Sequence, residues 1–174
     1  MVIKLILIKM KQTTPTQKGL LTGALMILAS LFSLYVLKNP VDSYFRYIIY
    51  TIYCTGIIWS LISYSKSANN KKSITNYFSI AFKTFVITTL MIVTFTYIYF
   101  SFHVEFRDNM IAENSRLLRV EGHHLPREID EFAVQSKKMF LTGIISVYIF
   151  GYLVMGAVVS LITAGFLSKK STTA

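Results

Sequence analysis

Residues 84–102 read TFVITTLMIVTFTYIYFSF and contain no charged side chain. Hydrocarbon is about 30 Å thick, so a helix needs about 20 mostly apolar residues to cross it, and this stretch is long enough. Strands of a membrane barrel alternate polar and apolar residues, whereas this run is continuously apolar, which favours a helix. The whole chain agrees, because 53% of its 174 residues are apolar and only 15% are charged. A soluble domain is typically about 25% charged.

Three further stretches have the same apolar character and are flanked by lysine or arginine. They are residues 19–37, 47–64 and 140–167. The last stretch is longer than a bilayer requires, so we expect it to tilt or to extend past the lipid. The sequence therefore predicts an all-α polytopic membrane protein, in which four transmembrane helices form a bundle and a single domain (residues 19–167).

The connection formed by residues 103–139 is the one polar region large enough to fold. We expect two short helices there, the first covering about Glu105–Val120. Gly122 then predicts a break, and Pro126 is suited to the first turn of a second helix, where its missing N–H costs nothing. Such helices could lie on the membrane surface, cover the mouth of the bundle or contact a partner.

The distribution of lysines predicts the orientation. An even number of spans puts both termini on one side, and that side comprises residues 1–18, 65–83 and 168–174. It carries ten lysines and no acid, whereas the other side carries eight basic and eight acidic residues. Basic residues near span ends favour the cytoplasmic side, so we expect both termini to be cytoplasmic. Whether translation starts at Met1 or at Met10 stays open.

Ionisable residues in the sequence offer few candidate sites. His123 and His124 are adjacent, and His103 begins the polar connection, so an external metal or pH-sensing site is one hypothesis. Adjacent residues point in different directions, however, and solvated loop histidines are the simpler interpretation. Lys83 precedes the third span; a lysine within a turn of the boundary can reach the headgroups, so we interpret it as an interfacial lysine.

Small residues recur every four positions in two of the predicted spans. Gly19 and Gly23 do so in the first span, and Gly156, Ser160 and Ala164 do so in the fourth. Small side chains at this spacing let helix backbones approach closely. We expect these residues to pack helices within the bundle, and a homodimer seam is the alternative.

Motifs for chemistry are missing from the sequence. It contains no nucleophile–base pair, no phosphate-binding glycine loop, no metal motif and no long basic run. We therefore expect a protein that is not an enzyme, needs no cofactor and binds no nucleic acid. No acidic residue, arginine or histidine lies inside a predicted span, which counts against an ion-coupled carrier without excluding one that uses hydroxyls and carbonyls.

Three stretches carry a family resemblance. They are SITNYFSIAFKTF (residues 73–85), Gly122 followed by PREI (residues 126–129), and GAVVSLITAGFLSKK (residues 156–170). With them, the chain resembles, over most of residues 15–170, the short four-span proteins catalogued as domain of unknown function family 4199. The resemblance implies a bacterial inner-membrane protein, mostly of the Bacteroidetes lineage, and implies no particular activity.

These patterns predict a non-enzymatic inner-membrane protein that acts as an accessory subunit, a scaffold or a self-associating component. Its expected partners are the lipid bilayer and either a second copy or another subunit of a membrane complex. The first alternative is a small oligomeric transporter or channel with its pathway between protomers. The second alternative is an external sensor that uses the loop histidines.

Overall fold

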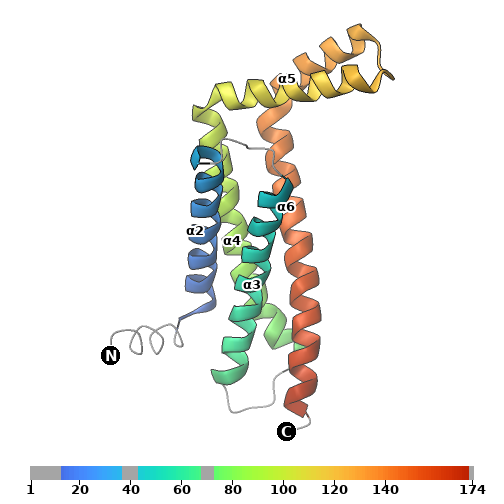
Figure 1. The fold of residues 1–174 in the computed structure, drawn as a ribbon. Helices are drawn as coiled ribbons and strands as arrows, with labels where there is room; N and C mark the ends of the chain where they lie inside the picture. Colours follow the sequence, from blue (N-terminus) through green and yellow to red (C-terminus); the bar gives the residue numbers. More distant parts are fainter. Residues whose placement is uncertain (1–12, 37–42, 68–72, 173–174) are drawn as a thin grey trace. The chain divides into compact units, whose positions relative to one another are not determined.

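The computed structural model describes residues 13–36, 43–67 and 73–172. Over these ranges the chain forms helices and no strand (Figure 1). The helices are α2 (Pro15–Val36), α3 (Ser43–Ser67), α4 (Ile74–Phe102), α5 (Val104–Glu121) and α6 (Pro126–Thr172). The predicted all-α fold class is confirmed. The simpler description as a four-helix bundle is wrong, because the described residues contain a fifth helix, α5.

Four of these helices, α2, α3, α4 and α6, are long and apolar enough to cross a membrane. Each contains one predicted apolar stretch, apart from Leu37 of the first stretch, which lies outside the described residues. The helices and the apolar stretches do not begin together. The reason is that apolar length is set by the lipid, whereas a helix begins where its first N–H groups are capped. At the start of α2, the Thr14 hydroxyl accepts from the Gln17 N–H, and the Gln17 side chain accepts from the Thr14 N–H. This reciprocal pair is a capping box, with Pro15 at the first helical position.

Helix α4 begins at Ile74, ahead of the apolar stretch that was predicted to start at Thr84. The Ser73 hydroxyl accepts a hydrogen bond from the Thr75 N–H at 3.4 Å, which satisfies one of the free donors of the first turn. No glycine or proline follows until after Phe102, so nothing interrupts the helix.

Helix α6 runs for 47 residues without a break. The predicted start at Pro126 is correct, but the second short helix expected within residues 103–139 is not separate, because it is the first part of α6. The bounds of the span predicted at residues 140–167 stay a prediction. The residues between Glu131 and Phe140 include neither glycine nor proline, so the helix continues through them. Lys137 and Lys138, which precede Phe140, can therefore mark a membrane boundary without ending the helix.

The chain divides into two compact units. The first unit comprises residues 1–92 and 150–174, which include α2, α3, most of α4 and the apolar end of α6. The second unit comprises residues 93–149, which include the end of α4, all of α5 and the first half of α6.

The interior of the first unit combines large apolar side chains with hydroxyls. Ser60 and Thr84 share a hydrogen bond of 2.8 Å between α3 and α4, and Thr88 donates to the Gly19 carbonyl of α2 at 3.1 Å. Helices in lipid gain little from burying apolar surface, so close packing and interhelical hydrogen bonds hold them together. The apolar side chains buried with these hydroxyls include Met26, Tyr53, Ile57, Leu61 and Phe85.

Candidate functional site

The candidate site lies in the second unit, on a helical hairpin that we call the arm (α5 and residues 126–139 of α6). The chain enters the arm at His103, which lies between α4 and α5. Its ring stacks on the Tyr99 ring with centroids 4.3 Å apart. The backbone N–H of His103 donates to the Tyr99 carbonyl at 2.9 Å. Phe106 packs against both rings, so an aromatic cluster fixes the first turn of α5.

The arm reverses direction at Gly122, which caps α5 with a φ of 70°. This left-handed conformation suits a residue without a Cβ. The next helix is then capped from its own first turn, because the Leu125 N–H donates to the Glu128 carboxylate at 3.0 Å. Ile111 of α5 and Ile129 of α6 are buried, which gives the hairpin a small apolar core.

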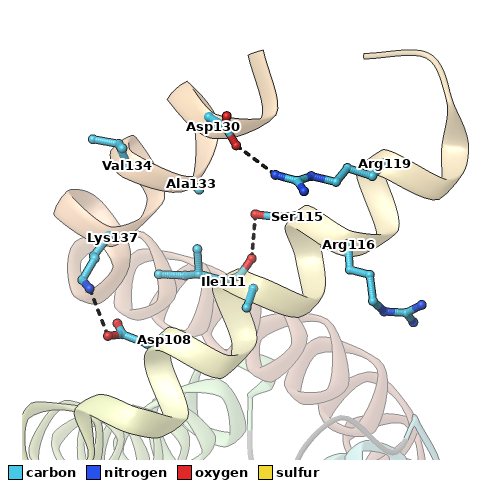
Figure 2. Close-up of a pocket in the computed structure, with 10 residues that line it drawn as sticks. Asp108, Ile111, Ser115, Arg116, Arg119, Asp130, Ala133, Val134 and Lys137 are labelled. Carbon is cyan, nitrogen blue, oxygen red and sulfur yellow. Dashed lines mark hydrogen bonds and ion pairs between the residues drawn. The ribbon is translucent and has the colours of Figure 1, made fainter. Parts of the chain in front are cut away.

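A groove of about 500 Å³ runs between the two helices of the arm (Figure 2). An ion pair lies toward each end: Arg119 contacts Asp130 at 2.9 Å, and Lys137 contacts Asp108 at 3.0 Å. The ion pairs join α5 to α6 and leave the apolar stretch between them open. The small and apolar lining residues are Ile111, Ala112, Ala133 and Val134.

Each charged side chain that lines the groove has an oppositely charged side chain within ion-pair distance. The hydrogen bond from Lys137, and then the one from Arg107 at 3.0 Å, lower the pKa of Asp108 below its ordinary value of 3.8. Arg116 pairs with Glu113 of its own helix through two bonds of 2.7 and 2.9 Å, which lowers the pKa of Glu113 and raises that of Arg116. Arg116 therefore does not take part in joining α5 to α6.

Replacing Lys137 by methionine is expected to raise the pKa of Asp108 toward its ordinary value. Because the folded pKa is lowered, the ion pair stabilises the arm at neutral pH, and this contribution is lost only as the pH falls through that pKa, below about 4. The pKa can be measured by NMR titration of the Asp108 carboxyl carbon. Lys138→Met is the control, because it removes the same charge one residue away; an equal shift in both variants would contradict the assigned ion pair.

The three candidate histidines do not come together. His123 and His124 lie in the exposed turn after α5, and the His124 Nδ1 is 3.8 Å from a Glu128 carboxylate oxygen. His103 lies at the opposite end of α5, whose 18 residues span about 27 Å. Within the described residues, no three histidine, cysteine or acidic side chains are grouped so that they could hold a metal ion.

The predicted small residues of the first span lie against α4. A Cβ on Gly19 would be 2.7 Å from the Thr84 carbonyl oxygen, and a Cβ on Gly23 would be 2.8 Å from the Met91 sulfur. Real Cβ atoms essentially never approach so closely. Because the atom that Gly19 faces belongs to the backbone, a larger side chain there would separate α2 from α4, whereas one at Gly23 would first have to displace the Met91 side chain.

The predicted small residues of the fourth span face the interior of the first unit, where Gly156, Ser160 and Ala164 are all buried. A Cβ on Gly156 would be 2.6 Å from the Tyr53 hydroxyl oxygen and 2.7 Å from the Phe85 ring. This surface of α6 is therefore occupied by α3 and α4. Ser160 donates to the Gly156 carbonyl, which satisfies its hydroxyl within the helix.

Lys83 is exposed on α4, next to the buried Thr84. It lies more than two helical turns after Ile74, where α4 begins, and its assignment as an interfacial lysine stays a prediction. The lysine that the structure buries is instead Lys18, whose ammonium lies 5.4 Å from the centre of the Trp59 ring.

Two further arrangements were missed from the sequence. One is the hydrogen bond of 2.7 Å that the Tyr53 hydroxyl donates to the Tyr152 carbonyl. The other is the pair of ion pairs in the arm. The midpoint in sequence of each ion pair falls between residues 122 and 125, in the turn that joins α5 to α6, so folding the sequence back about that turn would have found them.

Four apolar helices and a polar arm define this chain as a multi-pass α-helical membrane protein. The chain belongs to the family described as "Protein of unknown function (DUF4199)", whose sequence model matches residues 17–169. The match covers the whole arm and all but the terminal few residues of the four apolar helices. Comparison with curated proteins and with solved structures gave no significant match.

Proposed function

We propose that this protein is a non-enzymatic accessory subunit or scaffold of the bacterial inner membrane, and that it binds an amphipathic helix of a partner protein in the groove of the arm. The observation that carries the proposal is the groove itself. It is a mainly apolar groove between two antiparallel helices, with an ion pair toward each end. Helix-in-groove binding uses an apolar strip on the incoming helix and charged residues beside it.

The charge of the arm favours a protein partner over a lipid surface. Residues 103–139 carry six basic and seven acidic side chains, so the arm has no net positive charge with which to bind anionic headgroups. It nevertheless exposes large apolar side chains, among them Leu117, Phe132 and Val134, and an exposed apolar side chain on a polar region can form part of a contact surface. Of these, Val134 lines the groove.

The distribution of lysines supports an arm on the outer side of the membrane. The side with the termini carries ten lysines against eight lysines and arginines on the side of the arm, which favours cytoplasmic termini and leaves residues 103–139 outside. A partner would then be a membrane or envelope protein with a helix on that side.

Val134→Asp is expected to abolish partner binding. Val134 lines the groove and is 72% exposed, so a carboxylate there would be desolvated by an incoming apolar helix while the arm itself stays folded. Purification from native membranes in mild detergent, followed by native mass spectrometry, measures the stoichiometry of the complex. Val120→Asp is the matched control, because Val120 is 73% exposed on α5 but does not line the groove.

The proposal predicts one partner per chain in the wild type and in Val120→Asp, and none in Val134→Asp. Equal partner content in the two variants would contradict binding in the groove. A homo-oligomer without a second protein would contradict the accessory-subunit function and favour the transporter or channel alternative. Binding of metal that is lost on replacing His123 and His124 by alanine would favour the sensor alternative.

A further inference from the structure

A second hollow lies between α5 and α6, where the arm continues into the apolar part of α6. Its volume is about 380 Å³, and apart from Ile111 it shares no lining residue with the partner-binding groove. All of its lining residues belong to the second unit. Sites for small ligands typically measure about 300–1,000 Å³, so the hollow is large enough to hold part of a ligand.

One end of the hollow is polar but uncharged. Its polar side chains are two amides and one hydroxyl, and none of them makes a hydrogen bond to another group in the described part of the chain. Amides and hydroxyls both donate and accept hydrogen bonds, so these groups are available to a ligand. They are Asn114 of α5 and Gln135 and Ser136 of α6.

The other end of the hollow is apolar and open. Met139 and Phe140 line it, and the Phe140 ring is held by an edge-to-face contact with Phe100, with centroids 5.3 Å apart. Gly143 completes this end, and a Cβ there would meet no atom within 4 Å. The glycine therefore leaves space that a larger side chain would occupy.

The position of the hollow along α6 matches the boundary of a bilayer. The predicted apolar stretch begins at Phe140, shortly after Lys137 and Lys138. Headgroups form a layer about 5–7 Å thick on each side of the hydrocarbon. With a boundary at Phe140, Ser136 lies about 6 Å outside the hydrocarbon, at the level of the headgroups, and Gly143 lies about 4.5 Å inside it.

The lining also indicates which headgroup fits. Among the residues that line the hollow none is charged, whereas the partner-binding groove has an ion pair toward each end. An anionic headgroup would therefore find no cation in the lining. A headgroup without net charge that carries both donors and acceptors, such as phosphoethanolamine, can be matched by the amides and the hydroxyl.

We propose that the hollow binds one phospholipid of zero net charge, with its headgroup against the three polar side chains and the start of one acyl chain against Phe140 and Gly143. This site is independent of the partner-binding groove. It holds one lipid at a fixed position on α6, in contrast to the lipids that exchange freely along the rest of the apolar surface.

A photoreactive lipid can locate the site in the full-length protein. The protein is reconstituted in phosphatidylcholine vesicles with a small fraction of phosphatidylethanolamine that carries a diazirine near the start of one acyl chain. Mass spectrometry of peptides after illumination gives the labelling of each residue. We expect Phe140 to be labelled about tenfold more than Thr142, which is exposed at nearly the same depth on α6 but does not line the hollow. Tenfold is the effect of about two hydrogen bonds to the headgroup.

Gly143→Leu is expected to fill the apolar end of the hollow and to bring the labelling of Phe140 down to that of Thr142. Gly151→Leu is the matched control, because Gly151 is an exposed glycine of the same helix outside the hollow. Equal labelling of Phe140 and Thr142 in the wild type would overturn the proposal whether or not the variants fold. An unchanged ratio in folded Gly143→Leu would also overturn it, as would stronger labelling of Phe140 by phosphatidylglycerol with the same diazirine.

Discussion

Replacing Gly156 by leucine is expected to destabilise the first unit by about 3 kcal/mol or more, because added side-chain volume in a packed interior forces its neighbours to move. The new Cβ alone would be 2.6 Å from the Tyr53 hydroxyl oxygen and 2.7 Å from the Phe85 ring. Tyr53 and Phe85 are themselves buried, so neither has room to withdraw. The surface of α6 at Gly156 would have to separate from α3 and α4.

The effect can be measured by unfolding the protein from mixed micelles with increasing fractions of sodium dodecyl sulfate. Gly151→Leu is the matched control, because Gly151 lies in the same helix and nothing lies within 4 Å of its Cβ position. Both substitutions raise the helix propensity and the apolar character of α6 equally. Equal stability of the two variants would show that α6 does not pack through Gly156.

The helices were largely predictable because lipid thickness acts on every span in the same way. An uncharged apolar stretch of about 20 residues indicates a transmembrane helix, so these stretches located all four apolar helices. The hairpin of the arm was also predictable in outline. Gly122 and Pro126 act on their own backbone, and the end of α5 and the start of α6 agree with them.

The continuity of α6 was not predicted: residues 126–139, which include Lys137 and Lys138, were expected to form a separate short helix ahead of the apolar stretch from Phe140. Charge determines where a helix leaves the lipid, whereas glycine, proline and capping residues determine where it ends. The residues around the two lysines contain none of these interruptions. One helix therefore crosses the position where two were expected.

The contacts of the candidate sites were the least predictable part. A spacing of four residues indicates that Gly156 and Ser160 share a helix face, but not which helix that face meets. The burial of Lys18 likewise depends on Trp59, which is distant in the sequence and is brought close by the packing of α2 on α3. A local sequence pattern shows which residues share a helix face and where a helix ends. The residues that such a face contacts are determined by the tertiary structure.

Replacing Tyr53 by alanine is expected to destabilise the first unit by about 3 kcal/mol. Tyr53 is fully buried, and removing its ring opens a cavity of roughly 100 Å³, which costs about 2 kcal/mol in a packed interior. Its hydroxyl also donates to the Tyr152 carbonyl at 2.7 Å and lies 3.4 Å from the Thr89 hydroxyl, a contribution of about 1 kcal/mol. The same detergent titration measures both terms together.

Tyr53→Phe separates the two terms, because it keeps the ring and removes the hydroxyl. We expect it to cost about 1 kcal/mol or less, since the Tyr152 carbonyl keeps its acceptor role within α6 and loses only a second hydrogen bond. Tyr47→Ala is the control on the same helix, because Tyr47 is 67% exposed and its removal opens no cavity. If Tyr53→Phe were as destabilising as Tyr53→Ala, the hydrogen bond, and not the packing of the ring, would be the main interaction that holds α3 against α6 at this position. If Tyr53→Ala were as mild as Tyr47→Ala, α3 and α6 would not be packed through this side chain at all.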